Sequence, residues 1–331
     1  MVMETPKHIA SLSLDLDNQW SYMKTHGDPG WEPFPSYLDV VVPRVLSFLK
    51  ERNLKITFFI VGQDAILEKN HAALSSIASA GHEIGNHSFN HDPWLHLYSE
   101  QQINREIALA EEHIEWVTGQ NPIGFRGPGY SLSRAVLKVL TCRGYQYDAS
   151  TLPTFIGPLA RAYYFMTAKL SSEEKRQRAK LFGTLKDGFR PIRPYRWNLD
   201  DNGKQEGMIE IPVTTLPILK IPFHLSYILY LSLFSQTLAI MYFKTALLLC
   251  RFTNTRPSLL LHPLDFLDSR DVPELSFFPA MKLTSEKKLL LVSEVLRLFS
   301  NHFTVLPLQQ HVHDVRETSG FLVIEPSFQP A

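Results

Sequence analysis

Cysteine is scarce in this chain of 331 residues, which contains only Cys142 and Cys250. Two cysteines cannot build a disulfide framework, so we exclude the small disulfide-stapled secreted domains and expect a reducing compartment. An excess of charge of one sign is also missing, because 33 Lys and Arg residues balance 33 Asp and Glu residues. The chain therefore has no global positive field, and we expect no nucleic acid partner.

The N-terminal residues lack the pattern of a secretory signal, because no charged segment is followed by an apolar one before the strand-like run HIASLSLDL, which begins at residue 8. We therefore expect a cytoplasmic protein, with peripheral contact to the inner membrane as an additional hypothesis. The rest of the composition is that of an ordinary globular protein, with 44% hydrophobic and 20% charged residues.

Strand-like and helix-like patterns alternate over most of the chain. Apolar runs typical of strands occur at 10–16, 55–62, 83–88, 123–131, 145–150, 207–215, 258–266 and 303–308. Helical patterns lie between them at 36–53, 71–82, 99–120, 133–145 and 285–302. Repeated strand–helix units are typical of a parallel sheet with helices outside, so the sequence predicts an α/β fold in which the sheet is open or closed into a barrel. We expect a single domain over residues 1–331.

A basic insertion interrupts this alternation at residues 153–206. Within it, residues 175–196 hold eight basic residues against one acid, Asp187. The insertion is expected to be either a solvated surface or a cradle for phosphate groups, which arginine binds well.

Ionisable side chains follow the predicted strands, at the ends where α/β folds carry their functional groups. They are Asp15, Asp17, His87, His91, Arg126 and His262. One Asp with two His residues supplies the three ligands of a catalytic zinc site. His87 and His91 have the spacing of the H-E-x-x-H motif, which would direct both imidazoles to one metal on a helical turn. Because Ser88 stands where that motif has its Glu, the base must come from elsewhere, and Asp15 is available.

The ordered segments SLDLDN, TFFIVG, GHEIGNHSFNH, FRGPGYS, YQYDAS and LLLHP resemble the motifs of the polysaccharide deacetylases. This is carbohydrate esterase family 4, whose shared unit is the NodB homology domain. The resemblance covers most of the chain except 153–206 and 216–250. It implies a distorted (β/α) barrel of the NodB type, a divalent metal, for which we expect Zn²⁺, and removal of acetyl groups from N-acetylated sugars.

The resemblance also implies a role for each of the six residues. Asp17, His87 and His91 would be the metal ligands, Asp15 the base that activates the attacking water, Arg126 the partner that holds this base ionised, and His262 the acid that protonates the leaving amine. Asp148 and Asp265 are both candidates for the acid that tunes His262. Leu16 separates the two aspartates that are adjacent in most members, which resembles the D-x-D branch of peptidoglycan deacetylases and cyclic-amide hydrolases.

Three functions follow as hypotheses. The favoured one is metal-dependent deacetylation of a cell-envelope glycan or a lipid-linked precursor. The alternative is hydrolysis of another linear or cyclic amide, a carbon–nitrogen bond that is not a peptide bond. A carbohydrate-binding protein without catalysis is a third class, which the complete set of ligand and acid–base candidates disfavours.

An apolar insertion, predicted to be helical, covers residues 216–250. Its central part, 223–243, is long enough for a membrane span of ~20 residues. A single crossing would place His262 and the metal ligands on opposite sides of the membrane, so we exclude it. We expect either a buried helical pair that covers the barrel or a helix that contacts the membrane surface.

Overall fold

The structure is a computed structural model that describes residues 8–178, 184–199, 207–318, 320–326 and 328. Parts of the predicted basic insertion, at 179–183 and 200–206, lie outside the described residues.

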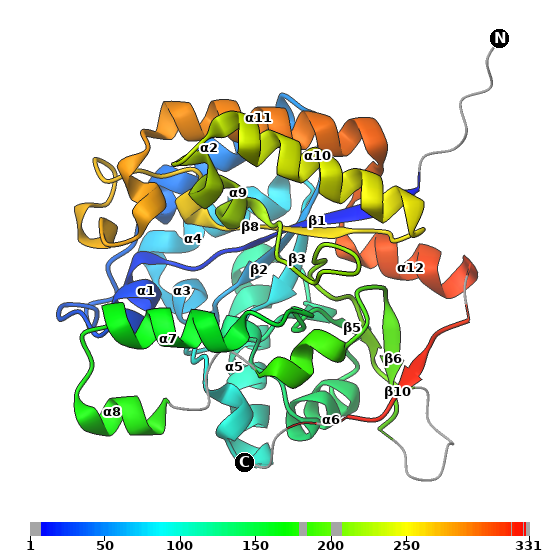
Figure 1. Ribbon diagram of the computed structural model, residues 1–331. Coiled ribbons are helices and arrows are strands. Elements are labelled where there is room, and N and C mark those ends of the chain that lie inside the picture. Colours follow the sequence, from blue (N-terminus) through cyan, green and yellow to red (C-terminus); the bar gives the residue numbers. More distant parts are fainter. Residues whose placement is uncertain (1–7, 179–183, 200–206, 319, 327, 329–331) are drawn as a thin grey trace.

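A curled, largely parallel sheet forms the centre of the molecule (Figure 1). Its strand order is β10-β6-β7-β5-β4-β3-β2-β1-β8, and β9 pairs with the start of β1. Among the described strands, the β6–β7 pair is antiparallel, and no pairing joins β8 to β10. The fold is therefore the distorted (β/α) barrel that the sequence predicts, in an open form. The strands are β1 (Ile9–Asp15), β2 (Thr57–Ile60), β3 (Glu83–Asn86), β4 (Gly124–Phe125), β5 (Tyr147–Asp148), β6 (Tyr195–Trp197), β7 (Ile209–Glu210), β8 (Ser258–Leu261), β9 (Thr304–Leu306) and β10 (Val323–Ile324).

Helices surround the sheet (Figure 1). They are α1 (Gln19–His26), α2 (Leu38–Lys50), α3 (Gly62–Ile66), α4 (Glu68–Ser79), α5 (Glu100–Thr118), α6 (Arg134–Cys142), α7 (Gly157–Thr167), α8 (Ser172–Gln177), α9 (Leu225–Ser232), α10 (Gln236–Phe252), α11 (Ser285–His302) and α12 (Leu308–Thr318). Helix α5 shows why the ends were predictable. Ser99 and Gln102 form a capping box at its start, and Gly119 adopts φ 70° at its end, where glycine meets no steric penalty.

The alternation of side chains along β1 separates the core from the site. Leu12 and Leu14 are fully buried in the largest apolar cluster, together with residues of α2, α4 and α11. The intervening side chains face the opposite way. Ser13 and Asp15 both contact Arg126 on that second face. Because the main chain of Leu16 continues the ladder by donating to Phe59 O at 2.9 Å, Asp17 follows Asp15 on the same face.

The apolar insertion forms two helices, α9 and α10, joined by a short turn. Phe223, which precedes α9, Ile228 of α9 and Phe243 of α10 belong to the largest core cluster. The two helices therefore pack against the core of the barrel. Within the described residues, no helix has both the length and the apolar character that crossing a bilayer requires. Several outer residues of the same segment remain exposed, which the expectation of a buried pair did not foresee.

Candidate active site

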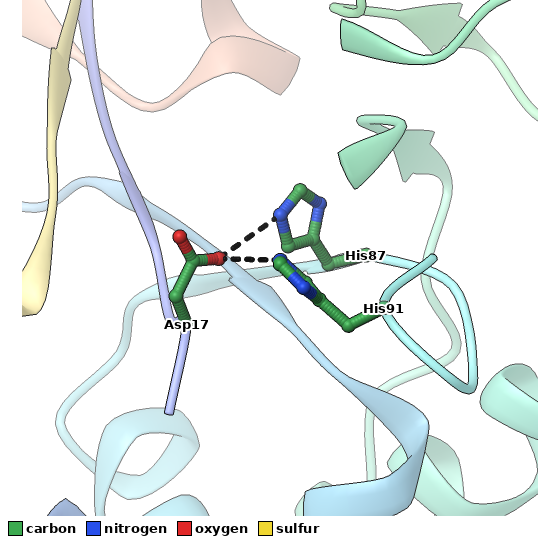
Figure 2. A group of neighbouring side chains, drawn as sticks. All are labelled: Asp17, His87 and His91. Carbon is green, nitrogen blue, oxygen red and sulfur yellow. Dashed lines mark hydrogen bonds and ion pairs between the residues drawn. The ribbon is translucent and has the colours of Figure 1, made fainter. Parts of the chain in front are cut away.

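Asp17, His87 and His91 converge just beyond the carboxyl ends of β1 and β3 (Figure 2). Nε2 of His91 lies 2.8 Å from Oδ1 of Asp17, and Nε2 of His87 lies 3.2 Å from the same oxygen. One ligand atom from each residue lies within 4.8 Å of the others, and all three residues are buried. Two imidazole nitrogens and one carboxylate oxygen are the donor set of a catalytic zinc site. The residues present therefore fit a divalent cation.

A strained loop, rather than a helical turn, brings the two imidazoles together. Residues 87–91 contain no helix, and Ser88 and His91 adopt φ values of 62° and 51°. Such left-handed backbone is uncommon for residues other than glycine and costs of order 1–3 kcal/mol. Asn86 stabilises the bend, because its Oδ1 accepts a 2.8 Å hydrogen bond from Ser88 N. The predicted helical turn is wrong, but the predicted convergence of the side chains is present.

Main-chain contact fixes the orientation of His87. Its Nδ1 lies 2.6 Å from the carbonyl oxygen of Arg126, which can only accept, so Nδ1 carries the proton. Nε2 is then the atom directed at Asp17, as in metal sites where an outer hydrogen bond sets the tautomer of a ligating histidine. For His91 the buried Nδ1 has no hydrogen-bond partner among the described residues.

The three groups are strongly coupled electrostatically. Burial alone would raise the pKa of the Asp17 carboxyl, but attraction to His91 and His87 holds this pKa well below its usual value. Burial would lower the pKa of His87, but Asp15 and Asp17 outweigh it and raise this pKa. Carboxylates and imidazoles at this site therefore lie close enough to shift each other's pKa values, and both kinds of group can bind a cation.

Arg126 pairs with Asp15 beside this cluster. Its Nη1 donates to Asp15 Oδ1 at 2.7 Å and to Ser13 Oγ at 2.8 Å, and its Nε donates to Ala149 O at 2.9 Å. The Arg126 side chain is fully buried, and its guanidinium lies 4.4 Å from the ring centre of Phe59. A guanidinium held at so many points fixes both the position and the charge balance of Asp15.

His262 follows β8 and lies on the wall of a cavity of about 710 Å³. Its main-chain N donates to Asp265 Oδ2 at 2.7 Å, and Ser226 Oγ lies 3.2 Å from His262 Nδ1 and 3.0 Å from Asp265 Oδ1. Asp265 is thus connected to His262. Asp148 hydrogen-bonds Ser150 instead. Between the two candidates that the sequence left open, the contacts favour Asp265.

The cavity joins the predicted acid to the basic insertion. Tyr130, Lys186, Arg190, His224, Tyr227 and His262 are among the side chains that line it. Lys186 and Arg190 are the described basic residues of the 175–196 stretch that reach it, and Arg190 is 3.0 Å from Asp187. The other described basic residues of this stretch point elsewhere, so the contacts give little support to a single phosphate cradle. Tyr130 lines the cavity, and burial, followed by the charge of Asp15, raises its pKa.

Two neighbours of the site were missed by sequence reasoning. His224 lies with its ring centre 5.9 Å from that of His262, and burial, followed by the charges of His262 and Arg126, lowers its pKa well below the usual value. Asp64 accepts hydrogen bonds from Asn18 at 2.7 Å and from Trp20 at 2.9 Å, and burial raises its pKa to about 7. His224 lay in the insertion that was treated as apolar, where a lone ionisable residue was the available signal. Asp64 lay between a predicted strand and a predicted helix, where no pattern singled it out.

Residues 28–147 match the family model described as polysaccharide deacetylase. A peptidoglycan-N-acetylglucosamine deacetylase of Bacillus cereus is 33% identical over 119 residues, which cover 34% of this chain and 50% of that protein. A peptidoglycan deacetylase of Helicobacter pylori is 29% identical over 115 residues, which cover 34% of this chain and 38% of that protein. The chain thus spans half or less of the length of these curated relatives.

A solved structure from Mycobacterium smegmatis, assigned to the polysaccharide deacetylases, resembles the whole fold. The TM-score is 0.63 at 18% sequence identity, and the match covers 100% of this chain and 97% of that chain. At this identity the likeness shows the fold, which agrees with the open (β/α) barrel described above.

Proposed function

Because the chain belongs to the polysaccharide deacetylase family, we propose that it is a metal-dependent deacetylase, which hydrolyses the acetamide of an N-acetylated sugar in a cell-envelope glycan or a lipid-linked precursor. The observation that carries the proposal is the buried convergence of Asp17, His87 and His91 next to the Asp15–Arg126 pair. The names of the peptidoglycan deacetylases that match the chain support the substrate class.

The proposed metal ligands are Asp17, His87 and His91, and the proposed ion is Zn²⁺ because of the nitrogen and oxygen donors. When bound, such an ion polarises the amide carbonyl and makes a water molecule more acidic. The loop at 87–91 and the carbonyl of Arg126 hold the two imidazoles in place before an ion arrives. This preorganisation reduces the cost of assembling the site.

Asp15 is the proposed general base. It takes a proton from the water that attacks the amide carbon, a role that requires an ionised carboxylate. The buried guanidinium of Arg126 supplies the positive charge that keeps two neighbouring carboxylates compatible at one site. Because Arg126 contacts Asp15 through one nitrogen, the second carboxylate oxygen of Asp15 is the one that can reach the water.

His262 is the proposed general acid. It gives a proton to the amide nitrogen as the carbon–nitrogen bond breaks, so acetate and a neutral amine leave instead of an amine anion. Ser226 contacts its ring, and Asp265 holds both Ser226 and the main-chain N of His262. His224, whose pKa is lowered by burial, stays neutral beside it and does not compete for the proton. The main-chain N of Tyr130 donates to Gly127 O at 2.9 Å, so this group is already engaged and does not serve as a donor to the carbonyl oxygen of the substrate.

The alternative function is hydrolysis of another linear or cyclic amide. It uses the same residues, so the distinction depends on the substrate. Activity on ureides or cyclic amides, with none on N-acetylated sugars, would favour it. Binding of a sugar in stoichiometric amount without release of acetate would instead indicate a carbohydrate-binding protein.

The first experiment measures the metal content of the purified protein and acetate release from N-acetylglucosamine oligomers. We expect about one zinc per chain in the wild type and its loss in Asp17→Ala and His91→Ala, because each variant removes one of three ligands. His313→Ala is the matched control, since His313 lies on α12 with a side chain that is 74% exposed. A wild type that stays free of metal after reconstitution would contradict the proposal.

A further inference from the structure

The outer surface of the second half of the chain carries a group of exposed apolar side chains, which we call the apolar face. Three lie on α7, one in the turn after α9, two on α10 and three in the 217–221 loop. Their exposed fractions are high: Leu159 71%, Tyr163 48%, Met166 83%, Phe234 87%, Leu238 49%, Met241 59%, Ile218 77%, Leu219 59% and Ile221 40%. Single exposed apolar residues are ordinary, but a group of this kind usually marks a contact surface.

Shared neighbours connect these elements into one surface. Helices α7 and α9 both contribute lining residues to the cavity beside His262, and α9 packs against α10. Tyr242 of α10 lies 3.0 Å from Pro222 O at the end of the 217–221 loop. Tyr227 and Tyr230 of α9 and Tyr242 of α10 are half-buried. Half-buried tyrosines therefore lie among the exposed apolar residues, which is the distribution found at the boundary between lipid and water.

The 217–221 loop presents its apolar residues rigidly. Ile218 and Lys220 adopt φ values of 71° and 55°, and a left-handed conformation is a genuine outlier for a β-branched residue such as Ile218. Main-chain hydrogen bonds of 2.8 Å join Leu216 with Ile221 and with Lys220, and Lys220 Nζ donates to Arg190 O at 2.6 Å. The surrounding contacts thus hold Ile218 and Leu219 outward in a strained loop.

The segments that supply the apolar face carry charge of one sign. Residues 149–172 and 211–264, which supply every member of the face, contain no Asp or Glu. They contain Arg161, Lys169, Lys220, Lys244, Arg251 and Arg256, of which Lys169 and Arg256 pair with Asp28 and Asp314 from other segments. In a chain that is neutral overall, these two segments therefore combine an excess of cations with exposed apolar side chains. Apolar side chains with adjacent cations are the features by which peripheral proteins bind anionic lipid.

We propose that the apolar face docks onto the surface of an anionic lipid bilayer. Leu159, Met166, Ile218 and Phe234 would enter the boundary between headgroups and acyl chains, while the neighbouring lysines and arginines contact the lipid phosphates. A second copy of this chain fits less well, because two such faces would bring cations of the same sign together. The face also borders the cavity beside His262, since α7 and α9 contribute lining residues to it. Lipid binding does not depend on the proposed hydrolysis, so the two proposals fail separately.

The test is co-sedimentation of the full chain with vesicles of phosphatidylcholine and phosphatidylglycerol, and with vesicles of phosphatidylcholine alone. Phe234→Ser combined with Met241→Ser should weaken binding to the anionic vesicles about tenfold or more, because two large apolar side chains no longer enter the lipid. The matched control combines Trp116→Ser with Leu290→Ser, which removes side chains that are 68% and 70% exposed on α5 and α11. The control should bind as the wild type does.

A charge variant separates the two contributions. Lys244→Gln should reduce binding to the anionic vesicles, and added salt should have the same effect in the wild type. Absence of vesicle binding by the wild type overturns the proposal. Equal loss in the control pair also overturns it. A stable dimer that dissociates in Phe234→Ser with Met241→Ser, without vesicle binding, would assign the face to a second copy instead.

Discussion

Arg126 holds His87 through its main chain and Asp15 through its side chain. The carbonyl oxygen accepts from His87 Nδ1 at 2.6 Å, and the guanidinium donates to Asp15 at 2.7 Å. A single residue therefore orients a proposed metal ligand and the proposed base. Substitution of the side chain leaves the first contact available and removes the second, so the two roles can be separated by experiment.

Arg126→Gln should lower kcat by roughly 10²–10³-fold while the metal content stays near that of the wild type, because general base catalysis contributes on this scale. Turnover on an N-acetylated oligosaccharide and elemental analysis on the same preparation check this. Equal loss of metal and turnover would show that Arg126 supports the fold of the site rather than the base.

Metal binding should stabilise the folded chain through Asp17. With free Zn²⁺ at about one hundred times its Kd, mass action predicts a gain of about 2.7 kcal/mol in the free energy of unfolding. Thermal denaturation of the wild type should therefore shift upward with Zn²⁺ and downward with a chelator. Asp17→Asn, which keeps the size of the side chain, should show neither shift. A wild type whose Tm changes neither with Zn²⁺ nor with the chelator would contradict the proposed metal site.

His262→Gln should affect substrates according to their leaving group. Amide hydrolysis requires protonation of the nitrogen, so we expect kcat to fall roughly 10²–10⁴-fold. Hydrolysis of an aryl acetate, whose leaving group departs without a proton, should fall much less. Side-by-side assays of the two substrates check this, and Ser226→Ala should give a smaller effect of the same kind. Identical losses on both substrates would remove His262 from the role of acid.

Asp64 should make stability depend on pH. Its pKa is about 7 in the folded chain and 3.8 ordinarily, so the folded state keeps a proton that the unfolded state loses. Stability from this group is therefore present at low pH and is lost as the pH rises between these two values, by about 1.4 kcal/mol for each unit of the window.

Asp64→Asn should remove this part of the pH dependence. Oδ1 of the new side chain can still accept from Asn18 and Trp20, and Oδ2, the atom replaced, has no partner among the described residues. Chemical denaturation on both sides of the window, with the wild type in parallel, checks the prediction. The prediction would be contradicted if the free energies of unfolding of the wild type and of Asp64→Asn changed equally with pH across the window.

Local sequence patterns were sufficient to predict a helix or strand whose capping residues and apolar periodicity lie within the element itself. Helix α11 begins and ends at residues 285 and 302, as predicted, because its cap and its apolar periodicity lie within it. Helix α2 continues through Pro43, although proline usually starts, kinks or ends a helix. Burial of Val41, Val42 and Val45 offsets the hydrogen bond that proline cannot donate.

The ends of the predicted strands were sufficient to predict which residues form the candidate site. They were not sufficient to predict which residues these side chains contact. Asp15, His87 and Arg126 meet because parallel strands bring their carboxyl ends to one edge. The left-handed residues of the 87–91 loop, and the link from Asp265 to His262 through Ser226, depend on segments far apart in the sequence. The short strands β6 and β10 pair residues 196 and 323, a separation that no local pattern reports.

The place of β1 in the sheet has a consequence for how the chain is made. This strand is synthesised well before its neighbours β8 and β9, because Ser11 pairs with Ser258 and Ala10 pairs with Val305. Asp17, His87 and His91 are therefore all synthesised long before β8 and β9, the strands that pair with β1. Closing so long a loop is slow, and an unpaired strand exposes its hydrogen-bonding edge meanwhile. The site thus becomes complete only when β8 and His262 have emerged, and a nascent chain arrested before residue 258 would present β1 to aggregation.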